Sequence, residues 1–156
     1  MKKFMIMCMM LLAATLTFTA CGDDDDDNNG GNNNQQQQEQ NEVNQDNYYK
    51  YQETVEVKGA GKITLRGEAW FENGKCTKVQ YSYVLPSKAA AKASYEQFED
   101  DDEWANVYYD GDKTITVTET QEEIATYATM DKAMVCELVK TIVKGMAQAM
   151  TNPGAK

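Results

Sequence analysis

Thiol and indole side chains are the groups in this sequence that could carry chemistry. None of the 156 residues is histidine, which excludes His-assisted nucleophiles, His-ligated zinc sites and the commonest general base. The sequence has no Cys-x-x-Cys pair and no glycine-rich phosphate loop before a helix. We therefore expect a non-catalytic domain that needs no cofactor and no metal. The residues left to consider are Cys21, Cys76, Cys136, Trp70 and Trp104.

Cys21 directly follows a predicted secretory signal peptide, residues 1–20. Lys2 and Lys3 precede an apolar stretch, and small residues lead up to Ala20. The apolar stretch is too short to span a bilayer as a helix, which is typical of a cleaved signal. Cleavage before Cys21 would place a thiol at the new N-terminus, where both thioether-linked and N-linked acyl chains can be built. Since each buried methylene contributes about 0.8 kcal/mol, two or three chains would give a durable anchor.

The junction at residues 18–21, Phe-Thr-Ala-Cys, resembles the lipobox of bacterial lipoproteins. In that family the cysteine receives diacylglycerol before signal peptidase II cleaves. Phe18 stands where leucine is usual. The resemblance implies that Cys21 is a lipid anchor in the membrane, whereas the alternative is an ordinary signal with an incidental cysteine.

Residues 21–47 are predicted to form a disordered acidic tether. They contain five consecutive aspartates, a run of asparagines and glycines, and four consecutive glutamines. Such a segment cannot bury enough apolar surface to offset chain entropy. The aspartates after Cys21-Gly22 resemble the acidic signal that, in one phylum of Gram-negative bacteria, exports lipoproteins to the cell surface. The resemblance implies the outer face of the outer membrane, and the alternative is a periplasmic lipoprotein with a solvated charge run.

Most of the negative charge belongs to the tether. Removing residues 1–20 takes away two lysines and no acid, so the mature chain has 13 basic and 25 acidic side chains, a net charge of −12. Eight acids and no base lie in residues 21–47, which leaves 17 acids and 13 bases in residues 48–156. Nucleic acid is a poor partner for this chain, because binding it depends on basic side chains that displace counterions.

Residues 48–156 are predicted to form one domain that opens with three strands, at about 53–58, 62–71 and 75–85. The segments alternate apolar and polar residues and break at residues 59–61 and at Asn73-Gly74. A two-residue Asn-Gly loop would place the apolar faces of the second and third strands back to back. We therefore predict a three-residue loop with a bulge, which pairs Ile63 with Tyr83, Leu65 with Tyr81 and Gly67 with Val79.

Two helices and three more strands are predicted to follow. Ser87 caps a helix at 87–101, and the clearest helical periodicity runs over 131–150. A second hairpin, at 104–109 and 113–119, turns at Asp110-Gly111. Residues 123–129 alternate like a strand, although their Glu and Ala residues also suit a helix. The order β-β-β-α-β-β-β-α predicts an α+β fold, an antiparallel sheet with two helices packed on one face.

This order of elements is similar to that of small bacterial lipoproteins of unassigned function, including the YehR-like group. The similarity spans most of residues 54–145 and implies no particular activity.

The predicted register places Thr64, Arg66, Glu68 and Trp70 on the face opposite the core. An exposed indole beside a guanidinium suits stacking on a sugar or anchoring a protein partner. Alternatively, the segment with Tyr48, Tyr49 and Tyr51 covers Trp70. Trp104, at the start of a short strand, is a second candidate of the same kind.

Cys76 and Cys136 either form a disulfide or remain two separate buried thiols. Closing a loop of about 60 residues would contribute about 4 kcal/mol in the chain-entropy model, and an exported protein meets an oxidising compartment. The predicted register turns Cys76 away from the helices.

The function expected from the sequence is that of a lipid-anchored envelope lipoprotein that binds a glycan or protein without catalysis. The alternative is a structural or accessory subunit that docks to another outer-membrane protein. Catalysis by carboxylates such as Asp110 and Asp112 is the least favoured hypothesis.

Overall fold

A computed structural model describes residues 41–99 and 104–152 of the chain. The predicted signal peptide, Cys21 and most of the tether lie outside these ranges. The strands are β1 (Glu42–Gln45), β2 (Tyr48–Val57), β3 (Gly61–Glu72), β4 (Lys75–Val84), β5 (Asn106–Tyr109) and β6 (Thr114–Thr118), and the helices are α3 (Lys88–Phe98), α4 (Gln121–Tyr127) and α5 (Lys132–Thr151).

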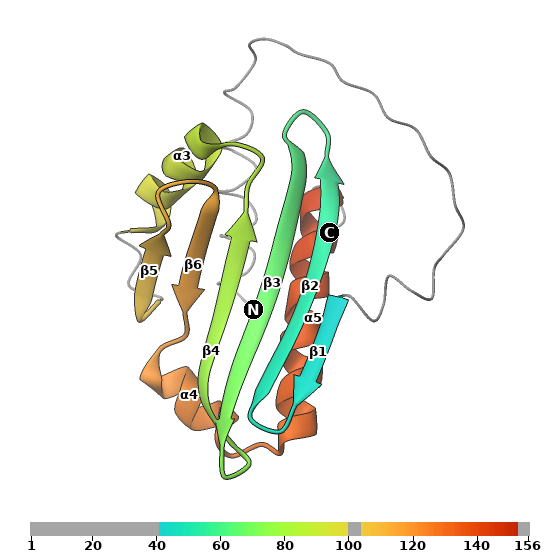
Figure 1. The fold of residues 1–156 in the computed structure, drawn as a ribbon, viewed down its shortest axis with the longest axis vertical. Helices are drawn as coiled ribbons and strands as arrows, with labels where there is room; N and C mark the ends of the chain where they lie inside the picture. The colour runs from blue at the N-terminus through green and yellow to red at the C-terminus, as the bar shows by residue number, and fades with distance from the viewer. Residues whose placement is uncertain (1–40, 100–103, 153–156) are drawn as a thin grey trace, which may run out of the picture.

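The six strands form one sheet in the order β1-β2-β3-β4-β6-β5, and every neighbouring pair is antiparallel. Figure 1 shows α5 lying across the half of the sheet formed by β2 and β3, with α3 and α4 at opposite ends of the other half. All three helices contribute buried side chains to the same core cluster as the sheet. The predicted α+β class with helices on one face of an antiparallel sheet is thus confirmed, with three helices rather than two.

The hairpin between β3 and β4 differs from the predicted three-residue loop. Asn73 and Gly74 both have positive φ, 51° and 77°, as a two-residue type I′ turn requires. The register then shifts between Trp70, which pairs with Lys78, and Phe71, which pairs with Cys76. The extra residue is therefore Thr77, whose hydroxyl donates a hydrogen bond to the Trp70 carbonyl at 3.3 Å. The bulge therefore lies at Thr77, beyond the two residue pairs next to the turn, and not in the turn itself. It brings the apolar faces of β3 and β4 to the same side of the sheet.

The observed pairs are Leu65 with Tyr83, Gly67 with Tyr81 and Ala69 with Val79, so each predicted pair was displaced by two residues. Because side chains alternate with a period of two, the predicted faces of β3 are nevertheless correct. Cys76 was placed wrongly. It lies on the turn side of the bulge, beside Phe71, and is buried on the helix-covered face.

The sheet begins earlier in the chain than residue 48, where the sequence places the start of the domain. Glu42–Gln45 forms β1, which turns at residues 46–47 and pairs with Tyr48 to Tyr51 of β2. Strand β2 itself starts five residues before the predicted strand at 53–58. Tyr49 and Tyr51, both buried, attach this segment to the core, which polar composition alone does not reveal.

The predicted strand at 123–129 is wrong, because residues 121–127 form helix α4. The Thr120 side chain accepts a hydrogen bond from the Glu123 N–H at 3.4 Å and so caps the first turn. Glu122 and Glu123 lie at the favourable end of the helix dipole. Ile124 and Tyr127, one turn apart, are the buried residues. A helix buries both, whereas in a strand they would point to opposite faces.

The other predicted elements are present. Ser87 caps α3 through the Ala90 N–H, and Asp131 caps α5 through the Met134 N–H. In the β5–β6 turn, the Asp110 carboxylate accepts hydrogen bonds from the N–H groups of Asp112 and Thr114, and Gly111 has a φ of 82°.

Helix α5 packs closely against the sheet at Gly67 of β3. A Cβ atom at this position would lie 2.6 Å from Val139 Cγ1 and 2.9 Å from Val143 Cγ2. Both valines are buried, and real Cβ atoms essentially never approach other atoms so closely. Glycine is therefore required at position 67 for the observed distance between helix and sheet.

We predict that Gly67→Ala destabilises the domain by about 1–3 kcal/mol, because the added methyl overpacks the contact with α5. The measurement is the free energy of unfolding in urea. Gly145→Ala is the matched control, since a Cβ there meets no atom within 4 Å, and its better helix propensity should leave stability unchanged or raise it by about 1 kcal/mol. An unchanged stability in Gly67→Ala would contradict the packing described.

Candidate functional site

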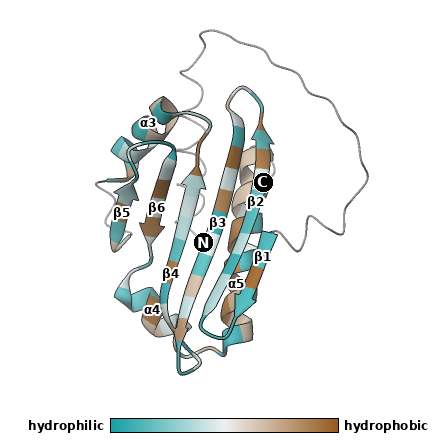
Figure 2. Ribbon diagram, in the orientation of Figure 1, coloured by the Kyte–Doolittle hydropathy of each residue, from teal (hydrophilic) through white to brown (hydrophobic). Residues whose placement is uncertain are grey.

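The helices of the described residues all pack on one side of the sheet and leave the other side without a helix. This side, called the open face, consists of the even-numbered residues of β2 and β3 and the residues paired with them on neighbouring strands. Hydrophobic and hydrophilic residues are interleaved along β3 in Figure 2, as expected for a strand with only one face in the core. The odd-numbered residues of β3 from Ile63 to Phe71 are buried, whereas the even-numbered ones from Thr64 to Trp70 are half-buried.

Trp70 stands at one end of the open face, between aromatic and basic neighbours. It pairs with Tyr48 on β2 and Lys78 on β4. The Tyr48 and Trp70 ring centroids are 5.5 Å apart with the rings tilted by 54°, and Lys78 Nζ lies 4.8 Å from the indole centroid. Of the three tyrosines considered as a cover for Trp70, only Tyr48 lies beside it, since Tyr49 and Tyr51 are in the core. Trp70 therefore remains partly exposed.

Glu68 and Arg66 continue along β3 from Trp70. The Tyr48 hydroxyl donates a hydrogen bond to Glu68, and burial together with that carboxylate raises the pKa of Tyr48. Arg66 lies between Gln52 and Ser82 on the adjacent strands, and its buried Nε has no hydrogen-bond partner in the described part of the chain.

Hydroxyl and amide side chains fill the rest of the open face. Thr54 and Thr64 are linked by a hydrogen bond of 2.8 Å, and Ser82 and Thr116 by one of 3.0 Å. Gln80 donates to Thr118 at 3.0 Å. The open face is thus a polar surface with aromatic residues at one end.

Trp104 does not belong to this surface, contrary to the sequence-based expectation. It is 7% exposed, and its ring meets Tyr81 edge-on at a centroid distance of 6.5 Å. Trp104 lies two residues before the short strand β5. Its ring belongs to the core cluster on the helix-covered side of the sheet. A surface role for Trp104 is excluded by this burial.

Cys76 and Cys136 are free thiols in the structure, and both are buried. Burial is the main cause that raises the pKa of each thiol. No disulfide joins them in the structure, and Cys136 is also among the causes that raise the pKa of Cys76. Buried thiols with raised pKa values are poor nucleophiles, because the thiolate is the reactive form.

Glu119 is the one buried acidic side chain among the described residues. The Tyr127 hydroxyl of α4 donates a hydrogen bond to it at 3.4 Å, and burial followed by the Glu119 charge raises the pKa of Tyr127. This contact joins α4 to the end of β6, and it was not predicted because it depends on a helix that the sequence pattern did not favour. Over the described ranges, no group of three or more potential metal-ligating side chains is present.

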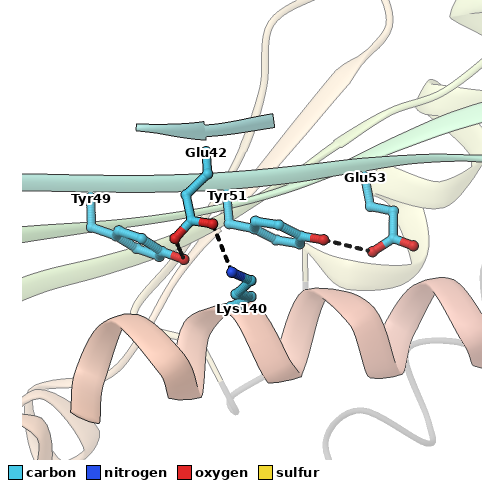
Figure 3. A network of polar contacts seen from close by, with 5 residues as sticks. All are labelled: Glu42, Tyr49, Tyr51, Glu53 and Lys140. Atoms are coloured by element: carbon cyan, nitrogen blue, oxygen red, sulfur yellow. Dashed lines mark hydrogen bonds and ion pairs between the residues drawn. The ribbon is translucent and has the colours of Figure 1, made fainter. Parts of the chain in front are cut away.

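A separate polar network attaches β1 to the helix-covered side (Figure 3). Glu42 forms an ion pair of 2.7 Å with Lys140 of α5 and accepts a hydrogen bond of 3.1 Å from the Tyr49 hydroxyl. Lys140 Nζ also lies 5.4 Å from the Tyr51 ring centroid. At the other end of β1, Lys132 Nζ donates to the Gln45 carbonyl at 2.5 Å. Helix α5 therefore holds both ends of β1, the first described strand of the sheet.

The Glu42 contacts predict a pH-dependent contribution to stability. The hydrogen bond from Lys140 is the largest influence on the pKa of Glu42 and lowers it from its usual 4.5. A lowered folded-state pKa gives stability that is present above pH 4.5 and is lost as the pH falls through the folded-state value. Glu42→Gln should therefore lower the free energy of unfolding by up to about 1 kcal/mol at pH 7.

In urea-unfolding measurements, this difference between wild type and Glu42→Gln should shrink as the pH falls below 4.5 and disappear once Glu42 is protonated in the folded state. Glu56→Gln, on the exposed part of β2, is the control and should behave as wild type. A Glu42→Gln deficit that persists unchanged at acid pH would show that the ion pair is not its source.

No helix in the described part of the chain is long and apolar enough to cross a membrane. Comparison with known proteins gives no matching family model, no matching curated protein and no matching solved structure. Function is therefore inferred from the residues of the chain itself, chiefly those of the open face.

Proposed function

We propose that this protein is an exported bacterial lipoprotein, anchored through acylated Cys21, whose domain is a non-catalytic binding module for a glycan or protein. The observation that carries the binding role is Trp70, held half-buried on the open face between Tyr48 and Lys78. Partly exposed aromatic side chains with basic and polar neighbours are typical anchors in recognition surfaces.

The surroundings of Trp70 support a binding surface more than a reaction centre. Glu68, two residues from Trp70 along β3, accepts a hydrogen bond from Tyr48. The sequence has no histidine to act as a base, and the Asp110 carboxylate is occupied by two backbone N–H groups of its own turn. A rigid sheet presents the indole with little loss of conformational entropy on binding.

The anchor and the open face are compatible in space. The chain enters the sheet through the edge strand β1, which is fixed on the helix-covered side by Lys140. In Figure 1, the described residues that follow the tether lie at this edge of the sheet and do not cross the open face. A tethered domain of this kind can present the open face to partners beyond the membrane.

Docking to another envelope protein is the second candidate, and the edge of β2 favours it. Strand β1 pairs only with Tyr48 to Tyr51, so residues 52–57 have no neighbouring strand on that side in the described part of the chain. The Asn47 carbonyl accepts from the Phe71 N–H. In an antiparallel pair such bonds recur at every second residue, so the odd-numbered residues of β2 bond to β3. The backbone groups of the even-numbered residues Gln52, Thr54 and Glu56 therefore point away from β3, toward the edge of the sheet, where a partner strand could pair.

The anchor is tested with Cys21→Ser. We expect this variant to lose fatty-acid labelling and to leave the membrane fraction, because no other acceptor thiol would stand at the mature N-terminus. Protease shaving of intact cells tests the surface location, and wild-type protein should be degraded. Protection of wild-type protein from the protease would place it on the periplasmic side, and unchanged labelling of Cys21→Ser would refute the anchor.

The binding role is tested with Trp70→Ala on glycan arrays and in pull-down experiments. Loss of the indole should weaken binding at least about tenfold, as for a central aromatic anchor. Met134→Ala is the control, since Met134 is 56% exposed on α5, which packs on the other side of the sheet. Equal binding by wild type and Trp70→Ala would show that the open face is not the binding site.

A further inference from the structure

We infer that the open face binds an anionic polysaccharide, one that carries carboxylate or sulfate groups on its sugar residues. This inference rests on the proposed function of the open face and specifies the chemical class of its ligand. Three observations carry it: the charge of the open face, the state of its basic side chains, and the groups that surround them.

The open face is basic on an acidic domain. Over β2, β3 and β4 it carries five basic and three acidic side chains. Residues 48–156 as a whole have the opposite balance, with 17 acids and 13 bases. The charged residues of the open face are Lys50, Lys62, Arg66, Lys75, Lys78, Glu56, Glu68 and Glu72.

Two of the acids lie at the ends of the strands, each directly opposite a lysine. Glu56 pairs with Lys62, and Glu72 pairs with Lys75. The third acid, Glu68, pairs with Lys50 of β2 in the same way and accepts the Tyr48 hydrogen bond. The two basic side chains without an acid opposite them are therefore Arg66 and Lys78, and Lys78 lies beside Trp70.

The three central cations are Lys50, Arg66 and Lys78. None of them forms an ion pair within the described residues, where the pairs are Lys92 with Glu96 and Lys140 with Glu42. Lys50 and Arg66 are half-buried, and Lys78 is exposed above the indole. Arg66 and Lys78 have no acidic side chain opposite them on the neighbouring strands, so an anionic ligand would supply the countercharge that these two cations lack.

The neighbours of these cations fit a sugar chain. Threonine, serine and glutamine side chains line the open face and can exchange hydrogen bonds with sugar hydroxyls. Trp70 and Tyr48 offer apolar surface to a sugar ring. The Arg66 guanidinium has the planar geometry that suits carboxylate and sulfate oxygens. Single-stranded nucleic acid fits less well, because the mature chain has a net charge of −12 and only three central cations.

The test measures binding of the full mature protein, in detergent, to four probes: polygalacturonate, chondroitin sulfate, neutral dextran and a single-stranded DNA oligomer. We expect binding to one or both of the acidic polysaccharides and none to dextran. Raising the NaCl concentration from 50 to 300 mM should weaken that binding at least about tenfold, because salt screens exposed charges. The two acidic probes distinguish carboxylate from sulfate recognition.

Charge-removing variants locate the site. Arg66→Gln and Lys78→Gln should each weaken binding at least about fivefold. Lys92→Gln removes the same charge from α3, where Lys92 forms an exposed pair with Glu96, and should bind as wild type. If Arg66→Gln fails to fold, Lys78→Gln decides the question, since Lys78 is an exposed side chain on the surface.

Several outcomes would overturn the inference. Binding to dextran that depends on Trp70 would refute an anionic ligand and leave the proposed binding face intact. Tighter binding to the DNA oligomer than to either acidic polysaccharide would assign the surface to another class of polyanion. Acidic-polysaccharide binding that is unchanged in Lys78→Gln would place the site elsewhere. If none of the four probes binds, and a protein partner from the pull-down binds Trp70→Ala as well as it binds wild type, both the inference and the proposed function are refuted.

Discussion

The close contact between helix α5 and strand β3 at Gly67 is the constraint on which the rest of the structure depends. Without a Cβ atom at this position, Val139 and Val143 can rest directly on the sheet. That contact fixes which side of the sheet the helix covers. Because side chains alternate between the two faces of a strand, it also decides which residues of β2 and β3 face the core and which face away from it. Ile63, Leu65 and Ala69 become core, while Arg66, Glu68 and Trp70 stay at the surface.

The bulge at Thr77 reconciles a favoured turn with this two-sided pattern. Asn73-Gly74 prefers a two-residue loop, which alone would turn the apolar residues of β4 away from those of β3. One extra residue restores the match and places Lys78 opposite Trp70. The composition of the candidate site therefore depends on a local irregularity, because a strand without the bulge would put a different side chain beside the indole.

The network around Glu42 gives the domain a firm attachment to its predicted tether. Lys132 and Lys140 of α5 hold the two ends of β1, and β1 pairs with the first residues of β2. The same segment brings Tyr48 beside Trp70 and places Tyr49 and Tyr51 in the core. The strand that follows the predicted tether and the strand that contributes Tyr48 to the open face are thus consecutive in the chain.

The sequence by itself determined the α+β class, the alternating faces of β3, the Ser87-capped helix predicted at 87–101 and the helix predicted at 131–150, because periodicity and capping are local properties. It also singled out Arg66 and Trp70 from their positions on one face. Only the tertiary structure decided the rest. Helix α4, the burial of Cys76 and Trp104, strand β1 and the neighbours Tyr48 and Lys78 all depend on partners distant in the chain. Their free energies come from packing and pairing between strands and helices, which no local pattern of residue types contains.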